Sequence, residues 1–141
     1  MSEVTRVRLS WHDGLAFLAR TGSGHTAVLD SPSRPDHLGA SPMELMLAGV
    51  AGCTAIDVVA ILNKMRVEVR GVEVEAQGTR ATTNPKYYTA IELTYRVRGR
   101  NVEREKVERA VELSHSTYCS ATASLRPDCR ITHRIEIVEE S

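Results

Sequence analysis

Hydrophobic and polar residues alternate along three short stretches near the start of the chain, and a two-residue period is typical of half-buried strands. These stretches are residues 7–11, 15–19 and 26–29. Asp13-Gly14 separates the first two and Gly-Ser-Gly at residues 22–24 separates the last two, and both sequences favour tight turns. The pattern predicts an antiparallel meander of three strands, followed by a loop.

A long apolar stretch follows this loop, and residues 41–59 read SPMELMLAGVAGCTAIDVV. Ser41 is suited to cap a helix that begins at Pro42, and Glu44 places a negative charge in the first turn, where it suits the helix dipole. We expect this helix to continue to about residue 65. Its apolar residues surround nearly the whole cylinder, which is typical of a helix buried on most sides.

The second half of the chain alternates again and then becomes helical. Residues 67–81 and 91–97 show the two-residue period of strands. Residues 102–116 carry one narrow apolar stripe among charged residues, which predicts an exposed helix. A short helix over residues 118–125 and a last strand over residues 131–137 complete the predicted order.

This order of elements indicates an α+β fold with an antiparallel sheet rather than a parallel doubly wound sheet, because the strands come in runs joined partly by short turns. The length suggests one domain, residues 1–141. A long helix that is apolar on all sides is difficult to bury in a chain of this size. We therefore expect the sheet to wrap around long central helices, with a second copy of the chain covering them in an intertwined homodimer.

Composition excludes several classes of partner. The chain has 18 basic and 18 acidic residues and no basic stripe, so no nucleic-acid surface is expected. The polar ends show no signal peptide, and Asp57, Asn63 and Lys64 interrupt the apolar stretch, so no membrane span is expected. These features predict a cytoplasmic protein.

Three cysteines are the main candidates for chemistry: Cys53, Cys119 and Cys129. Their odd number argues against a disulfide framework, and the lack of a CxxC pair and the scattered histidines argue against a zinc site, so we expect neither metal nor cofactor. Cys53 and Cys119 are each either a small buried hydrophobe or a reactive thiol, and together they could form a peroxidatic and resolving pair. Cys129 shares a face with the isoleucines of the last strand and is interpreted as a core residue.

A reactive Cys53 would need a cation from elsewhere in the fold, because it lies too far from the end of its own helix. Arg20, at the end of the second predicted strand, is a candidate, although an exposed arginine on a strand needs no function. Glu44 could hold such an arginine or serve only the helix dipole. Glu44 and Cys53 are separated by roughly 900° of helical rotation, so they face opposite ways unless the helix bends or the partner subunit supplies the glutamate.

Three stretches of the chain carry a family resemblance: SPMELMLAGVAGC, YYTAIELTYRVRG and VERAVELSHSTYCSATASL. They strongly resemble the OsmC/Ohr family of hydroperoxide-detoxifying proteins. The general OsmC-like branch is the closer match. The match runs from about residue 38 to residue 137. It implies an intertwined α+β homodimer in which each subunit wraps its sheet around paired central helices. In the best-known peroxidase branch an acidic residue stands where this chain has Met43, and here Glu44 follows one position later.

The resemblance also implies a thiol peroxidase. Cys53 would attack an organic hydroperoxide as a thiolate, Cys119 would resolve the sulfenic acid as a disulfide, and a cellular dithiol would reduce the pair. Arg20 and Glu44 would complete the catalytic set. The residues expected to contact the substrate are Leu45, Met46, Leu47, Val50 and Tyr118, and further candidate polar groups are His25 and His115. The alternative is a non-catalytic OsmC-like protein that binds a lipid-like ligand in the dimer cleft, with structural or redox-sensing cysteines.

Overall fold

The computed structural model of the chain describes residues 2–140. Contacts between residues divide it into two compact units, Met1–Met46 and Leu47–Ser141, each with its own three-stranded sheet. Strands and helices follow one another in the predicted order, and the α+β class is confirmed. The expectation that residues 1–141 form one domain stays a prediction.

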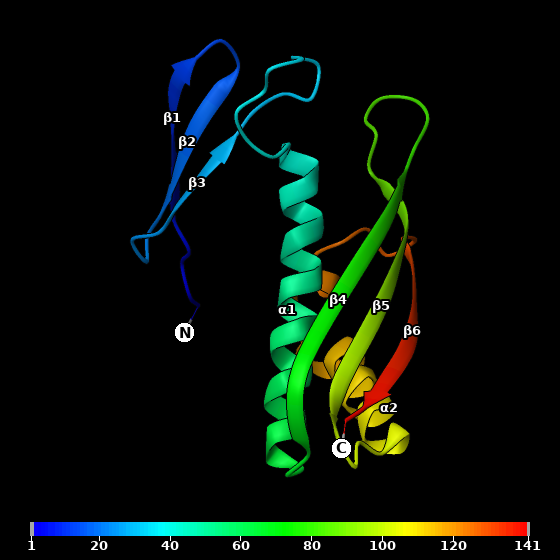
Figure 1. Cartoon of the computed structure of the whole chain (residues 1–141). Coiled ribbons are helices and arrows are strands. Elements are labelled where there is room, and N and C mark those ends of the chain that lie inside the picture. The colour runs from blue at the N-terminus through cyan, green and yellow to red at the C-terminus, as the bar shows by residue number, and fades with distance from the viewer. Residues whose placement is uncertain (1, 141) are drawn as a thin grey trace. The chain divides into compact units, whose positions relative to one another are not determined.

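The first unit contains the predicted meander. Strands β1 (Val7–Asp13), β2 (Ala16–Thr21) and β3 (Thr26–Leu29) form an antiparallel sheet in the order β1-β2-β3 (Figure 1). Gly14 takes up a left-handed φ of 54° at the first turn, and its N–H donates a 2.9 Å hydrogen bond to the Asp13 carboxylate. The sequence therefore places this turn correctly, because glycine accepts a positive φ without strain.

Strand β1 is exposed on both faces, which differs from the half-buried strand that its alternation predicts. Leu9 is 51% exposed and Trp11 is 66% exposed. Within the meander only Ala16 and Ala19 of β2 are buried. The alternation is correct as a strand signal, but the apolar side chains of β1 have no covering layer in their own unit.

Helix α1 (Pro42–Lys64) begins and ends close to the predicted residues. The Ser41 hydroxyl accepts a 3.1 Å hydrogen bond from the backbone N–H of Glu44, and the Glu44 carboxylate accepts a 2.9 Å bond from the backbone N–H of Ser41. This reciprocal pair is a capping box. It satisfies backbone donors that have no partner within the helix and so fixes where α1 starts.

The buried surface of α1 is a single stripe. Its buried residues recur at every fourth position: Val50, Thr54, Val58 and Leu62. On another face Ile56 is 72% exposed, so a single chain does not bury the helix on most sides as expected. By length and composition alone the helix is also able to cross a membrane, as is the core helix of many water-soluble proteins.

The second unit is built on strands β4 (Glu68–Arg80), β5 (Tyr88–Arg100) and β6 (Arg130–Glu139), in the order β4-β5-β6 (Figure 1). Strands β4 and β5 are antiparallel, but β6 runs parallel to β5, so the expectation of a purely antiparallel sheet is wrong. The physical reason is the connection between β5 and β6. A parallel pair requires a long crossover, and the helical segments between these strands provide it.

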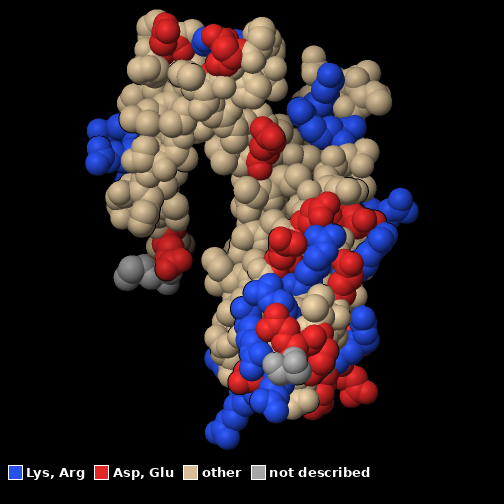
Figure 2. All heavy atoms as spheres, viewed as in Figure 1, with Lys and Arg blue, Asp and Glu red and all other residues tan. Residues whose placement is uncertain are grey.

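The two faces of this sheet differ as the alternation predicts. The face toward α1 carries four large buried residues of β5: Ile91, Leu93, Tyr95 and Val97. On the other face Arg96 forms ion pairs with Glu73, Glu75 and Glu136 at 3.4, 3.0 and 3.0 Å. Figure 2 looks onto this face, where acidic and basic residues gather.

The crossover between β5 and β6 contains an unusual helical turn. Helix α2 (Arg104–Leu113) continues into a π-helical turn η1 (Ser114–Tyr118), and the short helix α3 (Ser120–Ala123) follows. The backbone N–H of Cys119 closes the wide turn by donating to the carbonyl of Ser114 at 2.7 Å. Because the turn is wider than an α-helical one, it sets the directions of both Ser114 and Cys119, and such turns are frequent at functional sites.

Candidate functional site

The structure brings Cys53 and Cys119 together beside a carboxylate. The two sulfur atoms and a carboxylate oxygen of Asp57 all lie within 4.8 Å of one another, and both thiols are free. Cys53 and Asp57 share one face of α1, because residues four apart are neighbours on a helix. Cys119 reaches them from the junction between η1 and α3.

Cys119 is the more enclosed of the two thiols, with only 4% of the residue exposed. Its sulfur accepts hydrogen bonds from the Thr122 hydroxyl at 2.9 Å and from the Thr122 backbone N–H at 3.4 Å. Burial raises the pKa of the Cys119 thiol, the two bonds from Thr122 lower it, and the neighbouring Cys53 raises it again, with a net increase. Cys119 therefore favours the protonated thiol, which suits a resolving thiol better than a first nucleophile.

A chain of buried hydrogen bonds leads away from the Asp57 carboxylate. The Ser114 hydroxyl donates to Asp57 Oδ2 at 2.9 Å. Thr54 Oγ1 lies 2.9 Å from Ser114 Oγ and 2.8 Å from the Tyr95 hydroxyl. The Tyr95 hydroxyl in turn lies 2.9 Å from His115 Nε2. Thr54 and Ser114 are fully buried, so these bonds satisfy polar groups that water does not reach.

The direction of this chain follows from the single hydrogen that each hydroxyl carries. Ser114 uses its hydrogen on Asp57, so Thr54 must donate to Ser114. Tyr95 must then donate to Thr54, and His115 Nε2 must donate to Tyr95. This assignment places a hydrogen on Nε2 of His115. It also fixes the donor and the acceptor of every hydrogen bond from the imidazole to the carboxylate.

The imidazole end of the chain is a pair of stacked histidines. The rings of His115 and His133 lie 5.6 Å apart between centroids, with 11° between their planes. Burial lowers the pKa of His115, His133 lowers it further, and Asp57 raises it, with a net decrease. Burial raises the pKa of Tyr95 to about 12, so this hydroxyl stays protonated at neutral pH.

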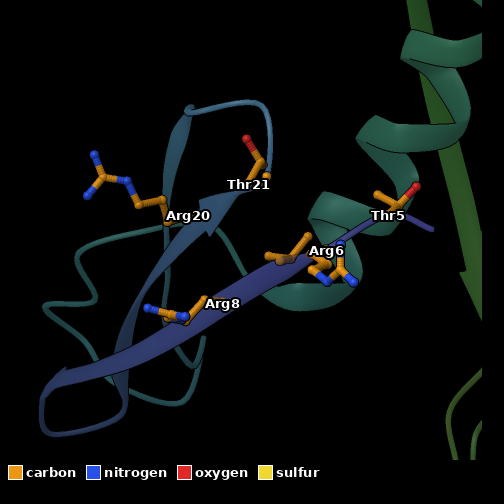
Figure 3. A pocket seen from close by; sticks show the side chains of 7 residues that line it. Thr5, Arg6, Arg8, Arg20 and Thr21 are labelled. Carbon is orange, nitrogen blue, oxygen red and sulfur yellow. The ribbon is translucent and has the colours of Figure 1, made fainter.

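Arg20 lies on the exposed face of β2, directly opposite Arg8 of β1. Figure 3 shows the shallow pocket that these residues line together with Thr5, Arg6 and Thr21, and the Arg20 side chain points away from that of Arg6. Within residues 2–46, Arg34 forms an ion pair with Asp36, whereas Arg6, Arg8 and Arg20 form none with a carboxylate. Arg20 is therefore unpaired within its own unit, and its catalytic role stays a prediction.

Glu44 is engaged in the capping box at the start of α1. The hydrogen bonds from Ser41, first from its backbone N–H and then from its side chain, lower the pKa of the Glu44 carboxyl. The structure thus gives Glu44 a role in capping the start of α1, while its catalytic role stays a prediction.

The predicted substrate contacts differ in their exposure. Met46 is 49% exposed and Tyr118 is 58% exposed, so both are accessible in a single chain. Val50 is 3% exposed and belongs to the packed stripe of α1. Leu45 and Leu47 are half-buried.

Comparison with known proteins identifies the family. The family described as OsmC-like protein matches residues 35–134. The chain belongs to the OsmC-like family. This OsmC-like chain is 40% identical over 133 residues to Protein YhfA of Escherichia coli (strain K12), covering 94% of this chain and 98% of that protein.

Solved structures agree with this assignment. A hypothetical protein from Aquifex aeolicus VF5 is 32% identical, with a TM-score of 0.89 over 99% of this OsmC-like chain and 100% of that chain. The organic hydroperoxide resistance protein OhrB of Bacillus subtilis is 19% identical, with a TM-score of 0.65 over 95% of this chain and 98% of that chain. The predicted family is confirmed, and the more distant structure shows the shared fold.

Sequence reasoning missed most of the polar residues of this site. Asp57 is treated above only as an interruption of an apolar stretch, although its spacing of four residues from Cys53 indicates a shared helix face. Thr54, Tyr95 and His133 carry no signal of their own in a single sequence. The OsmC-like fold brings them together from a helix and two strands that are distant in the chain.

Proposed function

We propose that this OsmC-like protein is a thiol peroxidase that reduces organic hydroperoxides. The observation that carries the proposal is the approach of the Cys53 and Cys119 sulfurs to within 4.8 Å. Two free thiols this close together are candidates for a disulfide, in which the sulfurs lie about 2.05 Å apart. Membership of the OsmC-like family supports the same chemistry, as does the fold shared with a protein named for organic hydroperoxide resistance.

The reaction follows from these residues. The thiolate of Cys53 attacks the distal oxygen of the hydroperoxide, the O–O bond breaks, and Cys53 becomes a sulfenic acid. The departing alkoxide takes up the proton that the thiol gave up and leaves as the alcohol. Cys119 then attacks the sulfenic sulfur, water leaves, and a Cys53–Cys119 disulfide forms. A cellular dithiol reduces the disulfide by exchange and becomes oxidised itself.

A nucleophilic thiolate is usually activated by a nearby cation, so the proposal requires a positive partner for Cys53. Arg20 is the proposed partner, with Glu44 as the residue that orients it. The proposed contacts to the substrate are Leu45, Met46, Leu47, Val50 and Tyr118. Replacement of Arg20 by Met should lower the rate of peroxide reduction by about 10²-fold or more, whereas the same change at Arg8 should not.

Peroxide consumption tests the proposal directly. The reduced protein is mixed with tert-butyl hydroperoxide and a dithiol, and the remaining peroxide is measured over time. We expect Cys53→Ser to abolish turnover. When peroxide is added without the dithiol, Cys119→Ser should stop at a sulfenic acid on Cys53, whereas the wild type should form the Cys53–Cys119 disulfide. Cys129→Ser, which changes a thiol outside the cluster, is the matched control and should retain the wild-type rate. A Cys53→Ser variant that still turns over would contradict the proposal.

A second candidate function is favoured by the exposed apolar residues of α1, including Met46 and Ile56. In this alternative the protein binds a lipid-like ligand and its cysteines are structural or redox-sensing. It predicts a lipid in the native mass spectrum of the purified protein and no consumption of peroxide. Native spectra without ligand, together with peroxide turnover, would eliminate it.

A further inference from the structure

We infer that the reduced Cys53–Asp57–Cys119 cluster is a binding site for a thiophilic divalent cation such as Zn²⁺. The cluster combines two thiols and one carboxylate, a donor set that suits zinc among the common biological cations. The inference uses the same cysteines as the proposed peroxidase but does not depend on catalysis. Metal binding is measured without peroxide, so the two proposals can fail separately.

The positions of the donor atoms fit a single ion. Zinc binds sulfur at about 2.3 Å and carboxylate oxygen at about 2.0–2.2 Å, so ligand atoms on one tetrahedral ion lie roughly 3.3–3.8 Å apart. The three donor atoms already lie within 4.8 Å of one another, and small side-chain rotations close the difference. Cys53 and Asp57 supply two donors from one helix face at the four-residue spacing that also serves helical zinc sites. Cys119 supplies the third from a separate segment.

Electrostatics favours a cation at this position. With both thiols ionised, three negative charges converge in a partly buried space. The hydrogen bonds to the Cys119 sulfur come from Thr122, which is neutral. A divalent cation offsets the repulsion and holds both thiols as thiolates, because metal binding displaces their protons.

Groups around the donors already hold them in place. The Ser114 hydroxyl donates to Asp57 Oδ2, and the other carboxylate oxygen is sufficient for a ligand that binds through one atom. Thr122 donates two hydrogen bonds to Cys119. Hydrogen bonds of this kind orient metal ligands and commonly change metal affinity by about 10- to 100-fold.

Three protein ligands leave the fourth position of a tetrahedral ion for water. The site therefore differs from a closed structural zinc site, which has four protein ligands. A disulfide between Cys53 and Cys119 would remove two of the three ligands. The cluster is thus expected to hold metal only in the reduced protein.

Zinc titration tests the inference. The full chain is reduced, freed of metal with a chelator and titrated with Zn²⁺ in competition with a chromophoric chelator. We expect one zinc per chain, a loss of more than about 100-fold in affinity for Cys53→Ser and Cys119→Ser, and a loss of about tenfold for Ser114→Ala. Asp57→Asn should also lose at least about tenfold. Cys129→Ser is the control and should bind as the wild type does.

X-ray absorption identifies the ligands. The expected zinc environment has two sulfurs at about 2.3 Å and oxygen neighbours at about 2.0 Å. A single sulfur, no binding at micromolar zinc, or wild-type affinity in Asp57→Asn would overturn the inference.

Alkylation of the wild-type protein gives a second measurement that does not depend on whether the variants fold. Stoichiometric Zn²⁺ should slow modification of Cys53 and Cys119 by N-ethylmaleimide by about tenfold or more, since zinc would hold both sulfurs. Cys129 is the internal control and should react at the same rate with or without zinc. Equal reaction of all three cysteines in both conditions would overturn the inference.

Discussion

At the scale of single residues, Tyr95 occupies the central position of the site. It is fully buried, and its hydroxyl joins Thr54 to His115 in the middle of the hydrogen-bond chain. The ring also packs edge-on against both histidines, with centroids 6.3 Å from His115 and 6.5 Å from His133. A buried hydroxyl in this position fixes the orientation of groups on both sides of it.

Removal of that hydroxyl should destabilise the protein. We expect Tyr95→Phe to lower the free energy of unfolding by about 1–3 kcal/mol, because it leaves buried polar groups without a partner. Tyr87→Phe removes the same atom from a ring that packs on Arg126 and should cost less than about 0.5 kcal/mol. Urea denaturation of both variants measures the difference, and equal losses would show that the hydrogen-bond chain does not stabilise the fold.

The lowered pKa of His115 predicts how stability depends on pH. The pKa of His115 is about 6.5 in the unfolded chain and lower in the folded protein. Between these two pKa values, the unfolded chain therefore binds more protons than the folded protein does. The contribution of His115 to the free energy of unfolding is therefore fully present above about pH 6.5. It decreases as the pH falls below this value and levels off below the pKa of the folded state. Denaturation curves from pH 7.5 to pH 5 should show a smaller decrease for His115→Gln than for the wild type.

The control for this experiment is His12→Gln, which changes an exposed histidine on β1. It should retain the wild-type dependence on pH. If His115→Gln and the wild type lose stability in parallel, His115 does not enter the folded state neutral.

At the scale of elements, the start of α1 separates a structural role from a catalytic one. Ser41 and Glu44 cap this helix reciprocally. Glu44 is also the acidic residue proposed to orient Arg20, so the same side chain has one role that is shown and another that is proposed. A glutamine can take the position of glutamate in a capping box but carries no charge.

Two substitutions distinguish these roles. Ser41→Ala should lower the free energy of unfolding by about 1 kcal/mol, because it removes the cap. Glu44→Gln should lower the free energy of unfolding by less than Ser41→Ala does, because it retains the cap and loses only the charge in the first turn. It should also lower peroxide turnover. Thermal unfolding and peroxide consumption measure the two effects. Normal turnover in Glu44→Gln would remove Glu44 from the proposed catalytic set.

At the scale of the whole molecule, the exposed surface of α1 indicates a missing partner. Ile56 is 72% exposed, and a side chain added at Gly49 or Gly52 would meet no atom within 4 Å. Small residues usually allow close approach by another element, and within residues 47–140 no other element approaches these two positions. We propose that a second copy of the chain packs here, as a homodimer of this family's fold.

The mass in solution tests the homodimer. Light scattering should give twice the mass of one chain for the wild type and for Val138→Asp, which changes an exposed apolar residue of β6. Ile56→Asp should shift the mass toward that of one chain, because it would bury a charge in the interface. If the wild type has the mass of a single chain, or if Ile56→Asp stays dimeric, α1 is not the interface.

A glycine substitution provides an independent measurement. In a helix open to solvent, Gly52→Ala should raise the free energy of unfolding by up to about 1 kcal/mol, because alanine has the higher helix propensity. In a tightly packed dimer the same change should lower it. The sign of the effect in chemical denaturation therefore reports whether a partner covers this position.

The sequence by itself determined the local elements of this protein, because the signals for them lie within a few residues. Alternation over residues 91–97 specifies β5, and Ser41 with Pro42 specifies the start of α1. The two motifs that contain Cys53 and Cys119 identified the family. Each of these features depends on neighbours along the chain, and a single sequence records such neighbours directly.

Only the tertiary structure decided the pairing of β6 and the composition of the site. The parallel register of β5 and β6 depends on the path of the crossover between them, and no local sequence pattern encodes this path. Asp57 becomes a partner of two thiols because the wide turn before Cys119 brings that sulfur to the face of α1 that carries Cys53. Contacts between distant segments depend on packing, and periodicity along the chain does not encode them.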